Sequence, residues 1–278
     1  MIQKSFNDTP SLYLIPTPIG NLDDITVRSL NTLKTVDVIL CEDTRDTGLL
    51  LSHYDIKKKL VSCHEYNEDK IIDNVVSMLK DGLNIGLVTD QGTPIISDPG
   101  YIVSRGVIEA GFNVISLPGA TAFVPALITS GISPQPFLFY GFLNSNDSKK
   151  KKELEELSDN KCTMIFYEAP HRIMKTLNLM LEIFGDRNVS ISREITKKFE
   201  SIYRGKISEV MKMVPEKGEF VLIVEGSSNS DIDESLSIVD AVNIYIKAGF
   251  SVMDSIKKVA KERNVPKNEI YNVYHKGE

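Results

Sequence analysis

The sequence contains no apolar run that approaches the roughly 20 residues needed to cross a bilayer. Its N-terminus, MIQKSFNDTP, also lacks the apolar core and the small-residue cleavage site of a secretory signal peptide. We therefore expect a cytoplasmic protein without a membrane role.

Cysteine is scarce as well, with only Cys41, Cys63 and Cys162 in 278 residues. Three widely separated cysteines provide neither a disulfide framework nor the paired spacing of a zinc site. We predict three buried, reduced thiols and no bound metal.

An excess of positive charge is absent, because the formal net charge is −6. Proteins that bind nucleic acid through its phosphates are usually basic overall or on one face, so this charge weakens that class of function without excluding it. Lysine and arginine gather only locally, at residues 57–59, 149–152, 193–198 and 257–258. Such runs usually lie on solvated helix ends and loops, and none of them alone predicts a phosphate site.

Two phosphate-binding patterns are also missing. No predicted strand is followed by G-x-G-x-x-G, and no glycine-rich loop ends in lysine. Cofactors that are held mainly by their phosphates are therefore disfavoured.

The sequence does contain an alternation of short Ile/Val/Leu-rich runs with amphipathic stretches. Such runs suit parallel strands covered on both faces, and their alternation with helices is typical of α/β folds. The expected strands are residues 12–16, 36–41, 60–63, 84–88 and 113–117, then 137–141, 163–167, 189–192, 201–204 and 220–225. The expected helices are residues 27–33, 70–80, 101–110, 121–130, 172–184 and 206–213.

The chain is longer than a usual single domain, and its composition changes after Glu225. The polar run GSSNSDIDES reads as a linker, and a purely helical pattern follows it from residue 236 to about residue 274. We predict an α/β domain at residues 1–118, a second α/β domain at 119–226, and a linker with a small helical module at 227–278.

Charged and polar residues follow several predicted strands directly. The segment CEDTRDT leaves the second strand with Glu42, Asp43, Arg45 and Asp46. Ligands of open α/β sheets bind at the carboxyl ends of the strands, although an N-cap at Asp43 would explain part of this segment.

The segment VTDQGTPIISDPG, residues 88–100, follows the fourth strand and contains no basic residue. Asp98 before Pro99 fits a helix N-cap, which is a purely structural interpretation. Gly92 would let backbone approach a ligand closely. Together with LPGATAFVPAL at the expected domain boundary, the loop suits a polar, weakly anionic ligand such as a nucleoside with an amino-acid arm.

Several of these segments together resemble the signature blocks of the bacterial 16S ribosomal RNA (cytidine-2′-O)-methyltransferases, a family of the tetrapyrrole methylase superfamily. The blocks span about residues 12–225, and in combination they are far more specific than any one alone. They are LYLIPTPIGNLDDIT, CEDTRDTGLLL, TDQGTPIISDPG, PGATAFVPALITSGI, FYEAPHR and SREITKKFE.

The resemblance implies two α/β domains with S-adenosylmethionine in the cleft between them, in a protein that forms homodimers. The cofactor contacts that it implies are Ile19, Gly92, Thr93, Pro94, Ile96, Gly119, Thr121 and Ala122. This chain departs from the family where Ser-Asp-Ala is replaced by residues 89–91, Thr-Asp-Gln, and where serine is replaced by Thr121. Both changes keep polarity and remove no charge.

The implied reaction is methyl transfer to the ribose 2′-hydroxyl of a cytidine in the decoding region of 16S ribosomal RNA, as free RNA or in the 30S subunit. A 2′-hydroxyl is a poor nucleophile, so a proton acceptor is needed. The candidates are Asp98, Glu168 and His171. Alternatively, Glu168 pairs with Arg172 across a turn and His171 only packs.

The expected contacts to the RNA are Asn21, Arg45, Arg172, Arg193 and Lys197. Two other functions remain open. One is a methylase of the same fold that acts on a tetrapyrrole or on a protein. The other is a non-catalytic module that binds the ribosome through the basic residues of the helical tail, which are Lys257, Lys258, Lys261 and Arg263.

Overall fold

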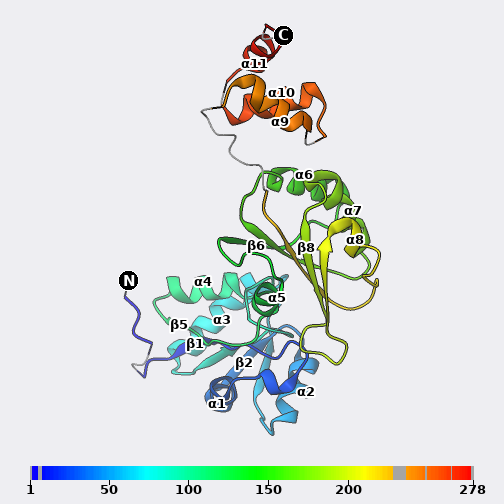
Figure 1. The fold of residues 1–278 in the computed structure, drawn as a ribbon. Helices are drawn as coiled ribbons and strands as arrows, with labels where there is room; N and C mark the ends of the chain where they lie inside the picture. The colour runs from blue at the N-terminus through cyan, green and yellow to red at the C-terminus, as the bar shows by residue number, and fades with distance from the viewer. Residues whose placement is uncertain (1, 6–7, 228–235, 248, 264, 277–278) are drawn as a thin grey trace. The chain divides into compact units, whose positions relative to one another are not determined.

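The computed structural model describes residues 2–5, 8–227, 236–247, 249–263 and 265–276. These residues form two compact units, the first made of residues 1–158 and 162–225, the second of residues 159–161 and 226–278. The elements of both units are labelled in Figure 1. Within the described ranges, no helix is long and apolar enough to cross a membrane.

The first sheet has five parallel strands in the order β3-β2-β4-β1-β5. Its strands are β1 (Ser11–Leu14), β2 (Val38–Cys41), β3 (Lys59–Ser62), β4 (Ile85–Leu87) and β5 (Asn113–Ser116). The connecting helices are α1 (Val27–Thr35), α2 (Thr44–His53), α3 (Glu68–Lys80) and α4 (Tyr101–Glu109), with a short 3-10 helix, η1 (Leu22–Asp24). The parallel sheet confirms the prediction from the Ile/Val/Leu-rich runs.

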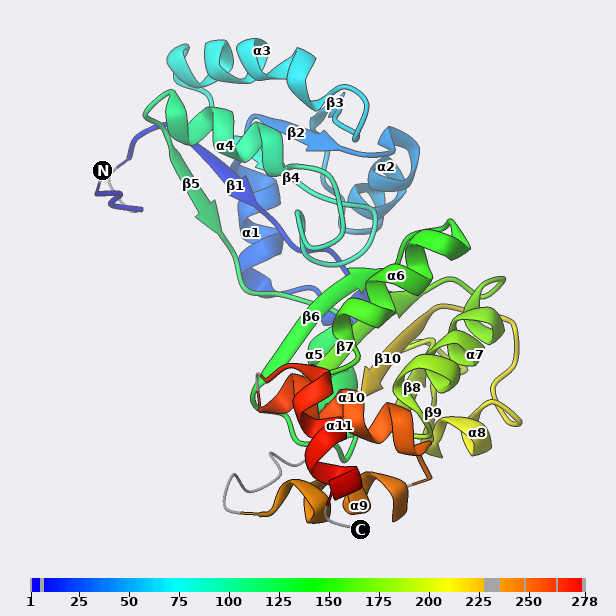
Figure 2. The ribbon, with the colours of Figure 1, turned by 90° about the horizontal axis from the view of Figure 1, so that it is seen from above.

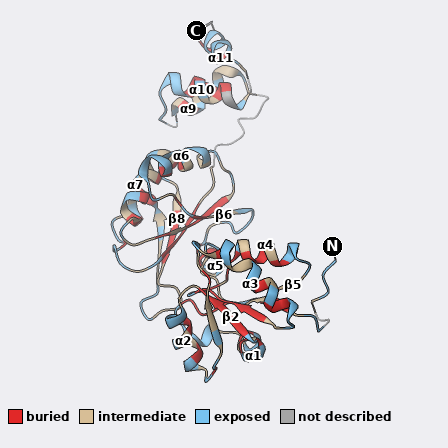
Figure 3. Cartoon of the chain, turned by 180° about the vertical axis from the view of Figure 1, so that it is seen from behind, coloured by how far each residue is buried: buried red, intermediate tan, exposed pale blue. Residues whose placement is uncertain are grey.

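Helices cover both faces of this sheet, because successive strand residues point to opposite sides. Leu12, Leu40 and Leu87 pack with residues of α3 and α4, whereas Ile15 and Ile39 pack with residues of α1 and α2. Helices α3 and α4 lie together on their face (Figure 2). The central strands β2 and β4 are buried, and the outward helix faces are exposed (Figure 3).

The second sheet also has five strands, in the order β6-β7-β10-β8-β9. Strands β6 and β7 are parallel and the other pairs are antiparallel, a mixture that the sequence pattern did not predict. The strands are β6 (Phe137–Phe142), β7 (Thr163–Glu168), β8 (Asn188–Arg193), β9 (Ser201–Lys206) and β10 (Phe220–Val224).

Helices cover the second sheet on both faces as well. One face packs against α6 (Asp147–Leu157), α7 (Ile173–Phe184) and α8 (Ile207–Val210), while α5 (Phe123–Thr129) packs on the other. The predicted fold class is confirmed. Both sheets lie in one compact unit, so the domain boundary proposed after residue 118 stays a prediction.

Two helices of this unit were not predicted. Helix α2 begins after Asp43, whose carboxylate accepts a hydrogen bond from the Arg45 amide, but Gly48 in its interior weakens the helical pattern. Helix α6 holds the lysine run at residues 149–152, and the expectation that such a run is solvated is wrong for Lys150, which is 1% exposed.

The second unit contains three helices in its described residues, α9 (Ile238–Lys247), α10 (Val252–Glu262) and α11 (Lys267–Lys276). They share a core of their own, which includes Val242, Tyr245, Ile256, Val259 and Ile270. This is the predicted helical module. Much of the linker predicted before it lies outside the described residues.

The cysteines follow the prediction in part. Cys41 and Cys63 are buried, whereas Cys162 is only partly buried, which corrects the expectation for that residue. Burial raises the pKa of Cys63 to about 12, and the nearby acid groups Glu68 and Glu42 act in the same direction.

Candidate functional site

Loops at the ends of several strands of the first unit line a cavity of about 420 Å³. One wall comes from loops that follow the carboxyl ends of β1, β2 and β4, and the other from β7, β10 and the start of α5. It is lined by Ile19, Glu42, Asp90, Gln91, Gly92, Thr93, Ile96, Ser97, Asp98, Thr121, Ala122, Phe142, Tyr167, Glu168, Ala169, Pro170, Ile195, Glu219, Phe220 and Val221. We call it the acidic cavity.

Backbone hydrogen bonds fix the loop between β4 and α4 at one rim of the acidic cavity. Thr17 and Gly92 form an isolated antiparallel bridge, in which the Thr17 amide donates to the Gly92 carbonyl (2.9 Å) and the Gly92 amide donates back (3.1 Å). The Thr93 hydroxyl then donates to the carbonyl of Ala120 (2.9 Å). The two loops that the sequence singled out are therefore tied together.

Glycine is required at one point of each loop. Gly92 has a φ of +91°, and a Cβ there would lie 3.1 Å from Cγ2 of Ile19. At Gly119 a Cβ would lie 2.4 Å from Cβ of Pro16, closer than two carbons can pack. Each glycine allows its own loop to pack closely against the loop that follows β1.

Backbone strain is concentrated in the loop between β4 and α4. Ile95 and Ser97 have φ values of +76° and +65°, and a β-branched residue in this region is a true outlier. Such conformations cost about 1–3 kcal/mol each and cluster at ligand sites. The helix that follows begins at Tyr101 with Gly100 at its N-cap, so the interpretation of Asp98 as an N-cap is wrong.

The charge of the acidic cavity has one sign. Among the described residues that line it, five are acidic and none is lysine, arginine or histidine; the five are Glu42, Asp90, Asp98, Glu168 and Glu219. Burial raises the pKa of Asp98 to about 6, and the charges of Glu42 and Asp90 add to this rise, while the Thr89 hydroxyl opposes it. Burial also raises the pKa values of Glu42 and Asp90. Such a lining favours a ligand that carries positive charge.

Tyr167 is a polar lining residue that sequence reasoning missed. Burial raises the pKa of its phenol, although the Thr121 hydroxyl and the backbone of Phe123 and Ala122 lie close enough to hydrogen-bond to it. Its ring packs edge-on against Phe139 and Phe142. Tyr167 therefore connects β7 to the start of α5, and the nearly continuous apolar run of its strand gave no sign of this.

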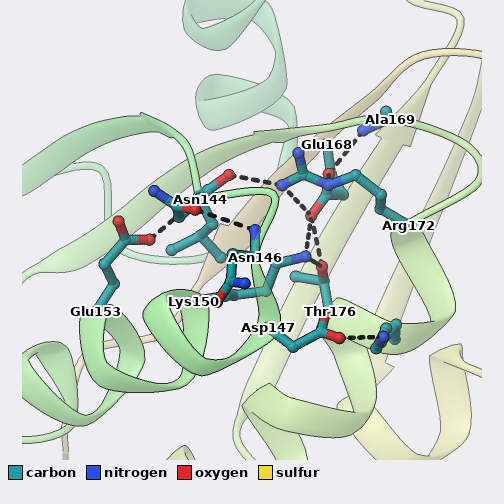
Figure 4. Close-up of polar contacts among 11 residues, drawn as sticks. Asn144, Asn146, Asp147, Lys150, Glu153, Glu168, Ala169, Arg172 and Thr176 are labelled. Atoms are coloured by element: carbon teal, nitrogen blue, oxygen red, sulfur yellow. Dashed lines mark hydrogen bonds and ion pairs between the residues drawn. The ribbon is translucent and has the colours of Figure 1, made fainter.

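Glu168 is the central residue of a buried polar cluster, which is shown in Figure 4. Its Oε1 accepts a hydrogen bond from the Ala169 amide (2.9 Å) and pairs with Nε of Arg172 (2.9 Å). Its Oε2 accepts from the Thr176 hydroxyl and pairs with Nζ of Lys150 (3.4 Å). The Lys150 ammonium also donates to Thr176 (2.7 Å), and burial lowers its pKa against the opposing effect of Glu168.

The polar cluster bears on two predicted roles. Both oxygens of Glu168 are occupied by partners, so the carboxylate holds the turn rather than standing free in the cavity. Arg172 pairs with Glu168 and donates to the Leu143 carbonyl (2.6 Å), as in the structural alternative for this pair. His171 is exposed and does not line the acidic cavity.

The predicted cofactor residues gather at the acidic cavity in most cases. Six of the eight line it, namely Ile19, Gly92, Thr93, Ile96, Thr121 and Ala122. Pro94 and Gly119 are not among its lining residues. Residues of the second sheet, such as Ile195, Glu219 and Phe220, were missed because only the antiparallel pairing of β8 and β10 brings them there.

Of the remaining predicted substrate contacts, Asn21 and Lys197 line one groove, which Arg45 and Arg193 do not line. Arg45 is 87% exposed in its side chain and pairs with Asp43 (2.7 Å). Arg193 donates to the carbonyls of Lys217 and Phe199. Asn21 caps η1 by accepting from the Asp23 amide, and it shares a shallow groove with Lys197.

The match of a family model defines the class of this protein. The model of the tetrapyrrole (corrin/porphyrin) methylases matches residues 11–211, which cover the first sheet and most of the second. The chain belongs to this family, and it is therefore a methyltransferase.

More specific relatives are similar over nearly the whole chain. The ribosomal RNA small subunit methyltransferase I of Bacillus subtilis is 50% identical, with 98% of each chain covered. The protein of the same name from Streptococcus pyogenes serotype M18 is 44% identical over 99% of each chain, and that from Haemophilus influenzae is 46% identical over 82% of this chain and 83% of its own.

Solved structures share the fold at low sequence identity. A uroporphyrin-III C-methyltransferase from Thermus thermophilus has a TM-score of 0.54 and 16% identity over 77% of this chain and 93% of its own. A putative diphthine synthase from Entamoeba histolytica has a TM-score of 0.58 and 16% identity over 80% and 94%. Since these proteins have different substrates by name, their likeness shows the fold alone.

Proposed function

We propose that this protein methylates the ribose 2′-hydroxyl of a cytidine in 16S ribosomal RNA, with S-adenosylmethionine as methyl donor. The identity of 44–50% to proteins named ribosomal RNA small subunit methyltransferase I supports ribosomal RNA as the substrate. The observation that supports the donor is a cavity at the strand ends, formed by glycine-bearing loops, whose charged lining residues are all acidic.

The acidic cavity fits the proposed donor in size and charge. A volume of about 420 Å³ lies within the range of small-molecule sites. S-adenosylmethionine supplies a methyl group on a positively charged sulfonium, and it also carries an ammonium group. Glu42, Asp90 and Asp98 offer carboxylates to these charges, while Ile19, Ile96 and Val221 offer apolar contacts.

Asp98 is the residue we propose as proton acceptor. It lines the acidic cavity, and its pKa of about 6 makes it ionised at neutral pH yet more basic than an ordinary aspartate. Asp98 would accept the proton of the 2′-hydroxyl while the ribose oxygen forms its bond to the methyl carbon. The bond between that carbon and the sulfur of the donor would break in the same step, and its electron pair would stay on the sulfur as a neutral thioether. Glu168 would instead keep the turn at Ala169 and Pro170 in place, since its oxygens are already bonded.

The test is to incubate the protein with 30S subunits from a strain lacking the activity and with donor labelled in its methyl group. We expect the label on the ribose of one cytidine, mapped by mass spectrometry of nuclease fragments. Label on a base, on a protein or on an added tetrapyrrole would reject the proposed substrate. Calorimetric titration that detects no binding of S-adenosylmethionine would reject the proposed donor and favour a non-catalytic ribosome-binding module.

Two further properties belong to this proposal. Exposed apolar side chains on α5 and β6, which are Val124, Ile128, Phe137 and Phe142, support a homodimer that covers them. Sedimentation equilibrium of the purified chain tests this, and a monomer at micromolar concentration would contradict it. We also propose a cytoplasmic location, where ribosomal RNA is the substrate.

A further inference from the structure

A second surface feature of the first unit differs in charge from the acidic cavity. It is a shallow groove of about 610 Å³ lined by Gly20, Asn21, Leu22, Asp23, His53, Thr196, Lys197 and Lys198. Two lysines and a histidine face it, against one acidic residue. We call it the basic groove. Of the residues that line this groove, the sequence analysis expected substrate contacts only at Asn21 and Lys197.

A smaller cavity of about 210 Å³ adjoins both the basic groove and the acidic cavity. This connecting cavity shares Gly20 and Leu22 with the groove. It shares Asp90 and Gln91 with the acidic cavity. A chain-like ligand could therefore contact the groove while one of its units reaches toward the acidic cavity.

Lys197 links the basic groove to the acidic cavity. Its ammonium pairs with Glu219 (2.8 Å), which lines the acidic cavity, and with Glu194 (3.3 Å). Its aliphatic stem lies against Gly20, where a Cβ would come within 2.5 Å of Cγ of Lys197. The charge of Lys197 is thus already compensated by two carboxylates.

Lys198 and His53 differ from Lys197 in this respect. Within the described part of the chain, Lys198 forms no ion pair, and its ammonium lies 5.8 Å from the centre of the Phe199 ring. His53 ends α2, is exposed and stacks edge-on against Tyr54. Both side chains therefore offer N–H donors to a ligand in the groove.

The loop that carries the lysines is strained and faces both sites. Glu194 and Thr196 have φ values of +53° and +67°, although neither is glycine. Between them, Ile195 lines the acidic cavity, while Thr196 lines the basic groove. The Thr196 hydroxyl is buried without a hydrogen-bond partner among the described residues. The strain holds one loop in the shape that serves both cavities.

We propose that the basic groove binds the ribose–phosphate backbone of the RNA substrate beside the nucleotide that enters the acidic cavity, with Lys198 and His53 as phosphate contacts. This proposal rests on the proposed function, because it assigns a place to the RNA of the same reaction. A protein of net charge −6 needs such a local basic surface to approach a polyanion. The contacts position the RNA and read no base.

The test compares Lys198→Ala, His53→Ala and the double variant with a control, Lys80→Ala. Lys80 ends α3, which covers the other face of the first sheet from α2 and so lies away from the groove. The measurements are KM and kcat for methylation of 30S subunits between 50 and 200 mM salt. Thermal unfolding and the Kd of S-adenosylmethionine check that each variant keeps its fold and its cofactor site.

We expect each single groove variant to raise KM about three- to fivefold near physiological salt, with kcat changed less than about twofold. The slope of log KM against log salt should fall by about 0.7–0.9 in Lys198→Ala, because this variant loses one positive charge that neutralises a phosphate. Lys80→Ala should match the parent protein.

Two outcomes separate the proposals. If the parent protein methylates a cytidine ribose while both groove variants keep its KM and salt slope, the groove assignment is wrong and the proposed function stands. If the parent protein transfers no methyl group to 30S subunits, the proposed function is wrong and the groove assignment falls with it.

Discussion

Replacing Asp98 by asparagine should lower activity and raise stability together. The side chain keeps its size, but the variant can neither ionise nor accept a proton from a hydroxyl. Activity should fall by about 10²- to 10⁴-fold, the usual contribution of a general base. In the parent protein, kcat/KM should rise with pH through about 6, because only ionised Asp98 accepts the proton, and then level off.

The stability effect follows from the pKa of Asp98. The folded chain raises it from 3.8 to about 6, which means that folding disfavours the ionised form. The difference corresponds to about 3 kcal/mol, since one pH unit is worth about 1.4 kcal/mol. Folding is free of this cost below about pH 4, where Asp98 is protonated in both states, and the full cost applies above pH 6. The asparagine variant should therefore gain up to about 3 kcal/mol at pH 7.5.

The assay is thermal unfolding of both proteins at pH 7.5 and at pH 4.5. A gain of 1 kcal/mol raises the melting temperature of a unit of this size by about 2–4 °C, so a rise of several degrees is expected at pH 7.5. Most of this rise should disappear at pH 4.5. An equal rise at both pH values would show that the ionisation of Asp98 is not its source, and unchanged methylation would remove Asp98 from the mechanism.

Three other perturbations test separate parts of the structure. Lys150→Met should lower the free energy of unfolding by about 3 kcal/mol, since it removes the buried partner of Glu168, whereas Lys152→Met on the exposed face should change urea unfolding by less than 1 kcal/mol. Gly92→Ala should weaken binding of S-adenosylmethionine at least tenfold by calorimetry, because its φ of +91° is strained for alanine, and parent-like affinity would contradict this. Cys63, with a pKa of about 12, should resist iodoacetamide at pH 8 until the chain is unfolded, as followed by mass spectrometry.

The sequence predicted where the strands and helices lie in the chain better than it predicted which strands pair and in which direction. Runs of Ile, Val and Leu identified the strands because burial on both faces leaves a local mark. The direction of β10 leaves no such mark, since antiparallel pairing with β7 and β8 depends on residues far away in the chain. The α/β class was predictable for this reason, and the mixed second sheet was not.

The site shows the same division. Gly92, Thr93 and Thr121 could be predicted because their loops have an unusual composition directly after strands, and the family resemblance pointed to the same residues. Lys150 was missed in a run of four lysines, although Leu154 one turn later marks the same helix face as buried. A run of solvated lysines and a run that contains one buried, paired lysine look alike in sequence, because the packing of the folded chain decides which side chain points inward.

The bridge between Thr17 and Gly92 has a consequence for how the cavity is entered. Its two backbone hydrogen bonds close the rim without any help from a ligand. A ligand should therefore lose little binding free energy to the ordering of these two residues. The amides of both residues should accordingly exchange slowly with solvent even before any ligand is added.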